Sequence, residues 1–458
     1  MPTTYIQRTP STTGTPTIFT YSVWFKRGNL GAYSLIGGAK TSDSSNYKCG
    51  LYFNGDDRIQ FEQYGTGLHF NYQTWRQFKD TTAWYHLVVR YDSTDGTGGD
   101  RIKMYINGVE VTDWKTETDP GSSQVCYIGS TQDFFTDIGN SVDSGYFDGE
   151  MSHVNFIDGT AYDASTFGST NATDGMWEIN TAPSVTYGTN GFFLKMEDSS
   201  NLDLDSGTNT LTFTTSGTLI STKDTPSNNL ATNNYLMPTI DFTNDSIASI
   251  GNRTLMQTSN MKTMYSTLGV EAGKWYAEFK LRTATGTSNY AGMGIVNVSQ
   301  QPEYALGSAS SKKIGEYGNT VAYFSGGAVI RNTSTVRTDS TFTSGDIISI
   351  AMDCDNGFVY WAKNNTWQNS GDPTSGATGT GGYNFFTYLG TGGIYVMGVT
   401  GRSGASSAPY FDVNWGNGAY ANANFGSPNA DGNGFGAFSY APPTGFLTMC
   451  TKNISTNG

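Results

Sequence analysis

Two stretches of the sequence decide the fold: Trp84-Tyr-His-Leu-Val-Val-Arg-Tyr91 and Ile102-Lys-Met-Tyr-Ile-Asn-Gly-Val-Glu-Val111. In the second stretch, apolar residues recur at every other position from Ile102 to Ile106, which is the period of a β-strand with one apolar face. The first stretch is rich in aromatic and β-branched residues, so we expect it to form the neighbouring strand. Together these strands predict a sheet with one buried face, which needs a second sheet to cover it.

Asn107-Gly108 forms the turn of the predicted hairpin. Both residues tolerate the positive φ that a two-residue type I′ turn requires. Such a turn would place Ile106 opposite Val109, so we expect the apolar face to continue across the turn.

The composition excludes some classes of partner. Lys plus Arg of 26 against Asp plus Glu of 39 gives 26 − 39 = −13. Phosphate binding depends on clustered Lys and Arg, so nucleic acid is not an expected partner. The start, Met1 to Arg8, lacks the pattern of a secretory signal, and the apolar runs fall short of the roughly 20 residues of a membrane helix. We therefore expect no membrane association.

The four cysteines are Cys49, Cys126, Cys354 and Cys450. They show no Cys-x-x-Cys spacing and occur in strand-like or terminal contexts. We predict buried free thiols rather than a disulfide framework or a zinc site.

Strand-length apolar segments, separated by turn residues, recur throughout, and no helical period extends beyond a turn or two. The chain is therefore predicted to be all-β. Strands predicted in the first half are Ile18 to Phe25, Ser34 to Ile36, Cys49 to Phe53, Ile59 to Phe61, Trp84 to Tyr91, Ile102 to Val111, Val125 to Ile128, His153 to Ile157 and Gly191 to Lys195. Those predicted in the second half are Lys274 to Leu281, Ala291 to Val298, Val321 to Phe324, Asp346 to Met352, Phe358 to Lys363, Ile394 to Val399 and Phe411 to Trp415.

The predicted domain organisation depends on one polar, strand-poor stretch. Residues 223–234 contain Pro226 and a run of Asn and Ser that cannot bury much area, so they are predicted to be a linker. The predicted domains are residues 1–222 and 235–439, the second beginning at Tyr235. Residues 440–458 are predicted to be a separate tail segment.

Several motifs resemble known families. The two stretches quoted first resemble the core of a laminin-G-like, concanavalin-type sandwich. Tyr146-Phe-Asp-Gly-Glu-Met-Ser-His-Val-Asn-Phe-Ile-Asp-Gly-Thr-Ala-Tyr162 resembles a version of that domain in tailed-bacteriophage virion proteins, as does Tyr440-Ala-Pro-Pro-Thr-Gly-Phe446 near the end. The second half, with Gly273-Lys-Trp-Tyr-Ala-Glu278, resembles a SPRY domain, another concanavalin-type sandwich. The resemblance implies two tandem concanavalin A-like (jelly-roll) antiparallel β-sandwiches.

One departure from the SPRY pattern concerns a turn. SPRY hairpins commonly have Asn-Gly after the second strand, whereas Asn364-Asn365 occupies that position here. The turn type is therefore left open by the sequence.

The catalytic pattern of the related glucanases is missing. Those enzymes carry Glu-x-Asp-x-x-Glu on one strand, which sets two carboxylates on either side of a glycosidic bond. No such spacing occurs around Glu150, Glu178, Glu197, Glu271 or Glu278. We predict that the chain is not an enzyme, with a carboxylate pair assembled from distant strands as the alternative.

The histidine on the first quoted strand has a structural interpretation. His86 lies beside Trp84 and Val88, and we predict a hydrogen-bonded sheet histidine rather than a base or metal ligand.

Two kinds of binding site remain as hypotheses. Laminin-G-like domains often bind calcium, and Asp92, Asp95 and Asp100 offer oxygen ligands within one loop; the alternative is solvated turn aspartates, with no cofactor. Exposed tryptophans could stack against sugars, the alternative being that they belong to the cores. The candidates for glycan binding are Trp75, Trp114, Trp361 and Trp367.

The predicted function is that of a non-catalytic structural surface protein of a tailed-phage virion, assembled in the host cytoplasm. Two roles fit: a fibre or adhesin that binds host glycans, and a capsid decoration protein that binds none. The expected partners are other virion proteins of capsid or tail, a host surface glycan, and further copies of the chain, with a trimer as the expected homo-oligomer.

Overall fold

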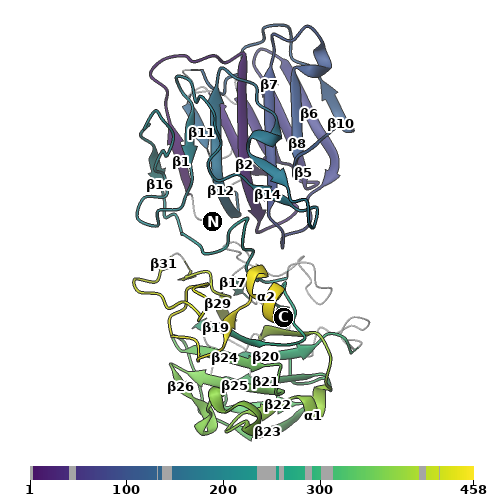
Figure 1. Cartoon of the computed structure of the whole chain (residues 1–458), viewed down its shortest axis with the longest axis vertical. Helices are drawn as coiled ribbons and strands as arrows, with labels where there is room; N and C mark the ends of the chain where they lie inside the picture. Colours follow the sequence, from purple (N-terminus) through teal and green to yellow (C-terminus); the bar gives the residue numbers. More distant parts are fainter. Residues whose placement is uncertain are drawn as a thin grey trace. The chain divides into compact units, whose positions relative to one another are not determined.

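The computed structural model describes residues 4–40, 48–130, 133–136, 147–234, 254–256, 262–283, 291–300, 313–401, 409–421 and 423–458. The chain divides into two compact units, Met1–Ser221 and Thr222–Gly458 (Figure 1). Tyr235, where the second sandwich was expected to begin, lies outside the described residues. Each unit is built mainly of antiparallel sheets, which confirms the all-β prediction.

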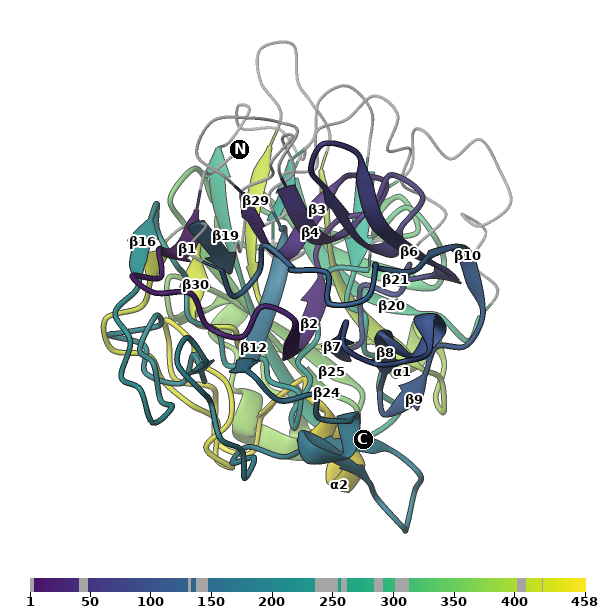
Figure 2. The same cartoon turned by 90° about the horizontal axis from the view of Figure 1, so that it is seen from above.

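The described part of the first unit contains two main antiparallel sheets. Across the larger sheet the strands are β10 (Trp114–Thr118), β6 (Leu68–Gln77), β5 (Arg58–Tyr64), β4 (Lys48–Phe53), β3 (Ser34–Lys40), β11 (Asp133–Thr136), β1 (Tyr5–Arg8) and β16 (Thr214–Ser216). Across the smaller sheet they are β15 (Phe192–Leu194), β12 (Gly149–Asp158), β2 (Ile18–Arg27), β7 (Tyr85–Asp92), β8 (Ile102–Ile106) and β9 (Val109–Glu110). A hairpin of β13 (Gly168–Thr170) and β14 (Trp177–Ile179) and two 3-10 turns, Gly98–Asp100 and Ala164–Thr166, complete the unit. Figure 2 shows β6 and β10 side by side, as their pairing requires.

The core of the first unit lies between these sheets. Alternate residues of β8, namely Ile102, Met104 and Ile106, are buried in it, as predicted. The turn at Asn107-Gly108 has φ of 49° and 79°, which also agrees with the prediction. The apolar face does not continue across the turn at once, however, because Val109 on the edge strand β9 is 71% exposed.

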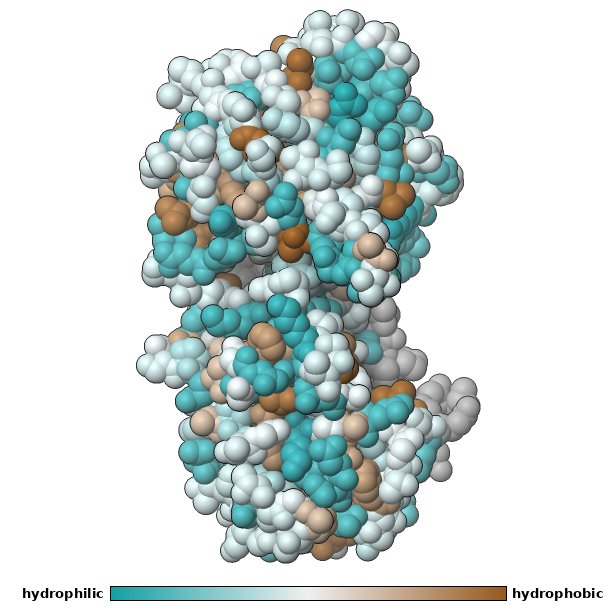
Figure 3. All heavy atoms as spheres, viewed as in Figure 1, coloured by the Kyte–Doolittle hydropathy of each residue, from teal (hydrophilic) through white to brown (hydrophobic). Residues whose placement is uncertain are grey.

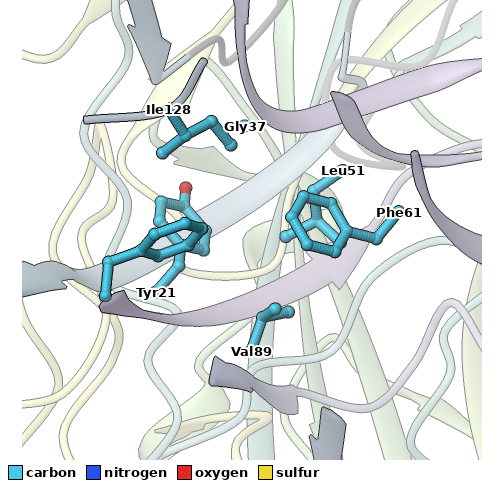
Figure 4. A pocket seen from close by; sticks show the side chains of 7 residues that line it. Tyr21, Gly37, Leu51, Phe61, Val89 and Ile128 are labelled. Atoms are coloured by element: carbon cyan, nitrogen blue, oxygen red, sulfur yellow. The ribbon is translucent and has the colours of Figure 1, made fainter. Parts of the chain in front are cut away.

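A small cavity of about 10 Å³ remains between the sheets. Its lining comes from both sides: Tyr21 and Val89 belong to the smaller sheet, and Leu51 and Phe61 to the larger one (Figure 4). A single water molecule would fill roughly this volume. Because the lining is apolar, the cavity offers such a water no hydrogen-bond partners.

A second layer covers part of the smaller sheet from outside. There His86 is fully buried, with its ring stacked on Trp24 at 4.8 Å and on Trp177 at 6.0 Å. Trp177 Nε1 donates to His86 Nδ1 at 3.0 Å, and Ser22 Oγ lies 2.9 Å from His86 Nε2. His86 is thus a hydrogen-bonded sheet histidine, as predicted.

The second unit also has two main sheets within its described residues. One consists of β17 (Thr254–Met256), β29 (Tyr410–Asn414), β19 (Lys274–Thr283), β24 (Ile347–Asp353), β25 (Phe358–Lys363) and β26 (Thr366–Trp367), with β27 (Tyr383–Asn384) on β25 and β32 (Leu447–Thr448) parallel to β19. The other consists of β18 (Lys262–Tyr265), β28 (Tyr395–Gly401), β20 (Ala291–Asn297), β21 (Thr320–Phe324), β22 (Ala328–Arg331) and β23 (Ser334–Thr338). Smaller elements are β30 (Ala419–Tyr420), β31 (Ala423–Asn424), α1 (Phe386–Leu389), α2 (Thr451–Asn457) and the 3-10 segments Gln368–Ser370 and Pro373–Thr378.

The turn that the sequence left open joins β25 to β26. Asn364 and Asn365 have φ of 46° and 65°, both in the left-handed region. Asn tolerates this region better than other residues with a side chain. The Asn-Asn pair therefore makes the same kind of two-residue turn as Asn107-Gly108.

The predicted linker and tail are both wrong, because both pack into the second unit. Leu230 and Ala231 are fully buried, and Ala231 N donates to Met449 O at 2.9 Å. Asp224 Oδ1 accepts from Leu230 N at 3.1 Å, so this polar stretch folds around a buried carboxylate. Phe446 is fully buried as well. The two segments hold each other in place.

One strand prediction in the first unit is wrong, and one long strand is missing from the predictions. Residues 125–128 form no strand, since Cys126 N donates to Pro16 O instead of a sheet neighbour and Val125 is 44% exposed. The ten-residue strand β6 was not predicted. This omission matters for the candidate site.

On the face in Figure 3, apolar residues are scattered among hydrophilic and intermediate ones. No helix among the described residues has the length and apolar character needed to cross a membrane.

Candidate functional site

The outer surface of β4, β5 and β6 carries the candidate site. On each of these strands, alternate residues such as Leu51, Phe61 and Tyr72 belong to the core. Side chains at the positions between them point to the opposite side of the sheet. Seven of these outward residues form what we call the β4–β6 face: Tyr52, Arg58, Gln60, Glu62, Asn71, Gln73 and Trp75.

Hydrogen bonds connect the polar groups of this face across three strands. Tyr52 Oη donates to Glu62 Oε1 at 2.7 Å, and Gln60 Nε2 donates to Glu62 Oε2 at 2.9 Å. Gln60 Nε2 also lies 3.2 Å from Asn71 Oδ1. These contacts fix the orientation of the amide and carboxylate groups before any ligand arrives.

Strand register places the same residues in rows. Tyr52 is opposite Gln60, and Gln60 is opposite Gln73. Glu62 is opposite Asn71 in the adjacent row. Since neighbouring strands lie about 4.8 Å apart, each row presents one hydrogen-bonding side chain roughly every 5 Å.

Trp75 supplies an aromatic surface at the edge of the face. Its side chain is 52% exposed, unusually open for a tryptophan. The Arg58 guanidinium lies 5.5 Å from the centre of the indole, a cation–π contact, and also donates to the carbonyl oxygens of Trp75 and of Thr74, the latter at 3.1 Å. Arg58 therefore holds one side of the ring while half of the side chain remains accessible.

The named residues of the face include one cation, Arg58, and one carboxylate, Glu62. Burial, with a contribution from the Glu62 carboxylate, raises the pKa of Tyr52 well above its usual value. Tyr52 therefore remains a hydrogen-bond donor at any physiological pH. Glu62 is only 7% exposed and is the one carboxylate that the described strands β4, β5 and β6 contribute.

The other three predicted glycan-binding tryptophans do not join this face. Trp361 is 1% exposed in the core of the second unit, so the prediction for it is wrong. Trp114 is opposite Thr74, on the inner side of the sheet, and packs edge-on against Tyr72 with ring centres 4.9 Å apart. Trp114 is thus a core-flanking residue, which corrects that prediction too.

Trp367 also packs against its own unit. It is half-buried against a small cluster that includes Tyr360 and Phe446. Of the four candidates, Trp75 alone combines high exposure with polar neighbours on the same face.

The three predicted calcium ligands make hydrogen bonds or an ion pair with residues close to them in the sequence. Asp92 Oδ1 accepts from Thr94 N and Oγ1 at 3.1 and 2.6 Å, and Asp95 Oδ1 accepts from Thr97 N at 2.8 Å. Asp100 pairs with Lys103 at 3.1 Å. Within the described residues, no three acidic, His or Cys side chains form a group that could hold a metal ion. These contacts fit the alternative of turn aspartates, and calcium binding by them stays a prediction.

Glu278, on β19 of the second unit, has a structural role. It is fully buried and accepts from Tyr420 Oη at 3.0 Å and from the backbone N–H groups of Ser439 and Tyr440 at 2.8 Å each. Burial raises the pKa of its carboxyl group, while these hydrogen bonds act in the opposite direction. Glu278 anchors the C-terminal segment to β19.

Most residues of the β4–β6 face were missed by the sequence analysis, although a signal existed. From Phe70 to Trp75 the sequence reads Phe-Asn-Tyr-Gln-Thr-Trp, which alternates buried and outward residues with a period of two. This period is typical of a half-buried strand and would have placed Asn71, Gln73 and Trp75 on one side.

Comparisons with known proteins agree with this architecture. The sequence profile of the family Laminin_G_3, described as the concanavalin A-like lectin/glucanases superfamily, matches residues 3–165. No curated protein sequence matches the chain.

Several solved structures are similar to parts of the chain. The SPRY domain of human HERC1 shares 14% identity, with 35% of this chain and 87% of that one covered and a TM-score of 0.27. The PSpry domain of TRIM65 shares 11% identity over 40% of this chain and 88% of that one, with a TM-score of 0.29. A "putative carbohydrate binding protein" from Bacteroides ovatus shares 18% identity over 47% of this chain and 56% of that one, with a TM-score of 0.33. The fold of this chain is concanavalin A-like, mostly β and built of antiparallel sheets.

Proposed function

We propose that this chain is a non-catalytic glycan-binding surface protein and that the β4–β6 face is its binding site. The observation that carries the proposal is the half-exposed indole of Trp75 beside ordered rows of amide and carboxylate groups. Sugar rings combine an apolar face with a rim of hydroxyl groups. An aromatic platform next to fixed donors and acceptors matches both parts.

The proposed ligand is a neutral glycan. Gln73 and Asn71 provide amide groups for sugar hydroxyls, while Gln60 and the nearly buried Glu62 hold this row in place through their own hydrogen bonds. The Arg58 cation is already engaged by Trp75, so it offers little to a sugar carboxylate or sulfate. The carboxylate of Glu62 would repel such groups.

The absence of a second acid on these strands supports binding without hydrolysis. Glycoside hydrolysis requires two carboxyl groups on either side of the scissile bond. Glu62 is the single carboxylate from the described strands β4, β5 and β6, and its oxygens already accept from Tyr52 and Gln60. Release of reducing sugar from a bound polysaccharide, abolished by Glu62→Gln, would contradict the non-catalytic part of the proposal.

A place on the surface of a tailed-phage virion is supported by the resemblance of residues 146–162 and 440–446 to virion proteins. A fibre or adhesin would use the β4–β6 face on host glycans, and a trimer would multiply weak single-site binding. A capsid decoration protein is the second candidate. Copy number in a map of the whole particle distinguishes them: a handful of copies at the tail fits the adhesin, and a number matching the capsid lattice fits decoration.

The ligand class is tested with an array of neutral, uronic-acid and sulfated oligosaccharides. We expect binding to neutral hexose oligosaccharides and weaker or no binding to the anionic ones. Binding confined to anionic sugars, and insensitive to Trp75→Ala, would overturn the assignment of this face.

A further inference from the structure

Two of the four cysteines meet in the core of the first unit. Cys49 is on β4 and Cys126 lies in the segment after residue 120; both are fully buried in the same core cluster. Their Sγ atoms are 3.4 Å apart, although the residues are 77 positions apart in the sequence. Among the described residues both remain free thiols, as predicted from the sequence.

The fold fixes the backbone on both sides of this contact. Cys49 is opposite Ala39 on β3 and Gln63 on β5, so it lies in the middle of the larger sheet. Cys126 N donates to Pro16 O at 2.9 Å. The two sulfur atoms are therefore held together by the tertiary structure and not by chance proximity of surface loops.

The distance is that of a thiol pair and not of a bond. A disulfide has an S–S length of about 2.05 Å, so the sulfur atoms must approach each other by roughly 1.4 Å. Rotation about the Cα–Cβ bonds with small backbone adjustment can supply a movement of this size. The other cysteines, Cys354 and Cys450, belong to the second unit and make no thiol–thiol contact within the part of the chain that the structure describes.

We propose that Cys49 and Cys126 form a redox-responsive site, which closes to an intramolecular disulfide when the protein enters an oxidising medium. The two thiols lose two protons and two electrons as the S–S bond forms. Molecular oxygen accepts both and is reduced to hydrogen peroxide; alternatively, an azodicarboxamide oxidant accepts them and becomes the hydrazine. The bridge would tie β4 to the 121–130 segment and close a long loop of the first unit.

The environment of the pair predicts slow oxidation. The attacking species in these reactions is the thiolate. Burial raises the pKa of the Cys49 thiol well above its usual value, and the adjacent Cys126 thiol contributes in the same direction. The folded protein should therefore remain reduced during brief exposure to oxidant and oxidise faster at higher pH.

The experiment measures the thiols of the whole chain. Protein purified with a reductant is freed of it, exposed to diamide (an azodicarboxamide) or to air, and analysed by intact mass and by thiol titration in denaturant. We expect the loss of two hydrogen atoms in mass and of two of the four thiols. Peptide mapping should link the peptides that contain Cys49 and Cys126, and the urea midpoint of the oxidised protein should be higher.

Two variants serve as matched controls. The double variant Cys354→Ser/Cys450→Ser keeps only the pair and should still lose two hydrogen atoms, whereas Cys126→Ser should lose none. Four titratable thiols after prolonged oxidation, or a bridge that contains Cys354 or Cys450, would overturn the proposal. The wild-type peptide map decides the question even where a serine variant fails to fold.

Discussion

Protonation of His86 should destabilise the first unit as the pH falls below neutrality. Nδ1 of this residue faces the indole N–H of Trp177 at 3.0 Å, and an indole nitrogen can only donate. Nδ1 must therefore be unprotonated, so Nε2 carries the proton and donates to Ser22 Oγ at 2.9 Å. A charged imidazole would place two donors against each other between two tryptophan rings.

The size of the effect follows from the pKa. Burial lowers the pKa of His86 from 6.5 to about 3. Between these values the unfolded chain binds a proton that the folded chain does not, so the free energy of unfolding falls as the pH decreases. At pH 5 the loss is about (6.5 − 5) × 1.36, or roughly 2 kcal/mol, and it continues to grow until about pH 3.

Urea unfolding at several pH values, compared between wild type and His86→Gln, isolates this contribution. Both proteins lose stability in acid through their other titrating groups, so the slopes between pH 7 and 5 are compared rather than the absolute stabilities. Between pH 7 and 5, the free energy of unfolding of the wild type should fall by roughly 2 kcal/mol more than that of His86→Gln. Equal slopes, or an imidazole of His86 that titrates near 6.5 in the folded protein by NMR, would refute the reasoning.

Three further predictions concern stability and are checked by urea unfolding. Glu278→Ala should cost about 3 kcal/mol or more, because it leaves buried donors such as the N–H groups of Ser439 and Tyr440 without an acceptor; a loss under 1 kcal/mol would contradict this. Gly108→Ala should cost about 1–3 kcal/mol, since φ is 79° and a Cβ would lie 2.3 Å from the Trp177 ring, and unchanged stability would be inconsistent with that packing. Leu51→Ala should cost about 2–5 kcal/mol by enlarging the cavity between the sheets, whereas a neutral result would mean that the core collapses around the site.

Strands with a strict local pattern could be predicted from the sequence. The hairpin around Asn107-Gly108 is an example, because alternation and turn chemistry both act within a few residues. The burial of Val109 could not be predicted in this way. Its exposure depends on β9 being an edge strand, which no local sequence pattern indicates.

The predicted linker and tail failed for a related reason. Residues 223–234 look unable to bury area, yet Asp224 satisfies the backbone around it and Leu230 fits beside Cys450. That partner is 220 residues away in the sequence. The composition of a segment indicates how much area the segment can bury by itself. Here the burial comes from a contact between two segments that are distant in the sequence.

The candidate site was predictable only in part. Trp75 was named from its residue type, but so were Trp114 and Trp361, which pack against or within the cores. A tryptophan suits both roles, so residue type cannot separate them. What separates them is the side of the sheet on which each side chain lies, which depends on the register of β6.

The central claim, that the β4–β6 face binds neutral glycans, is tested most directly by calorimetric titration of a neutral hexose oligosaccharide identified on the array. Trp75→Ala and Gln73→Ala should each weaken binding at least tenfold, while Val109→Ala, which removes an exposed apolar side chain elsewhere in the same unit, should leave it unchanged. Equal affinity of Trp75→Ala and wild type, with both proteins folded, would contradict the account.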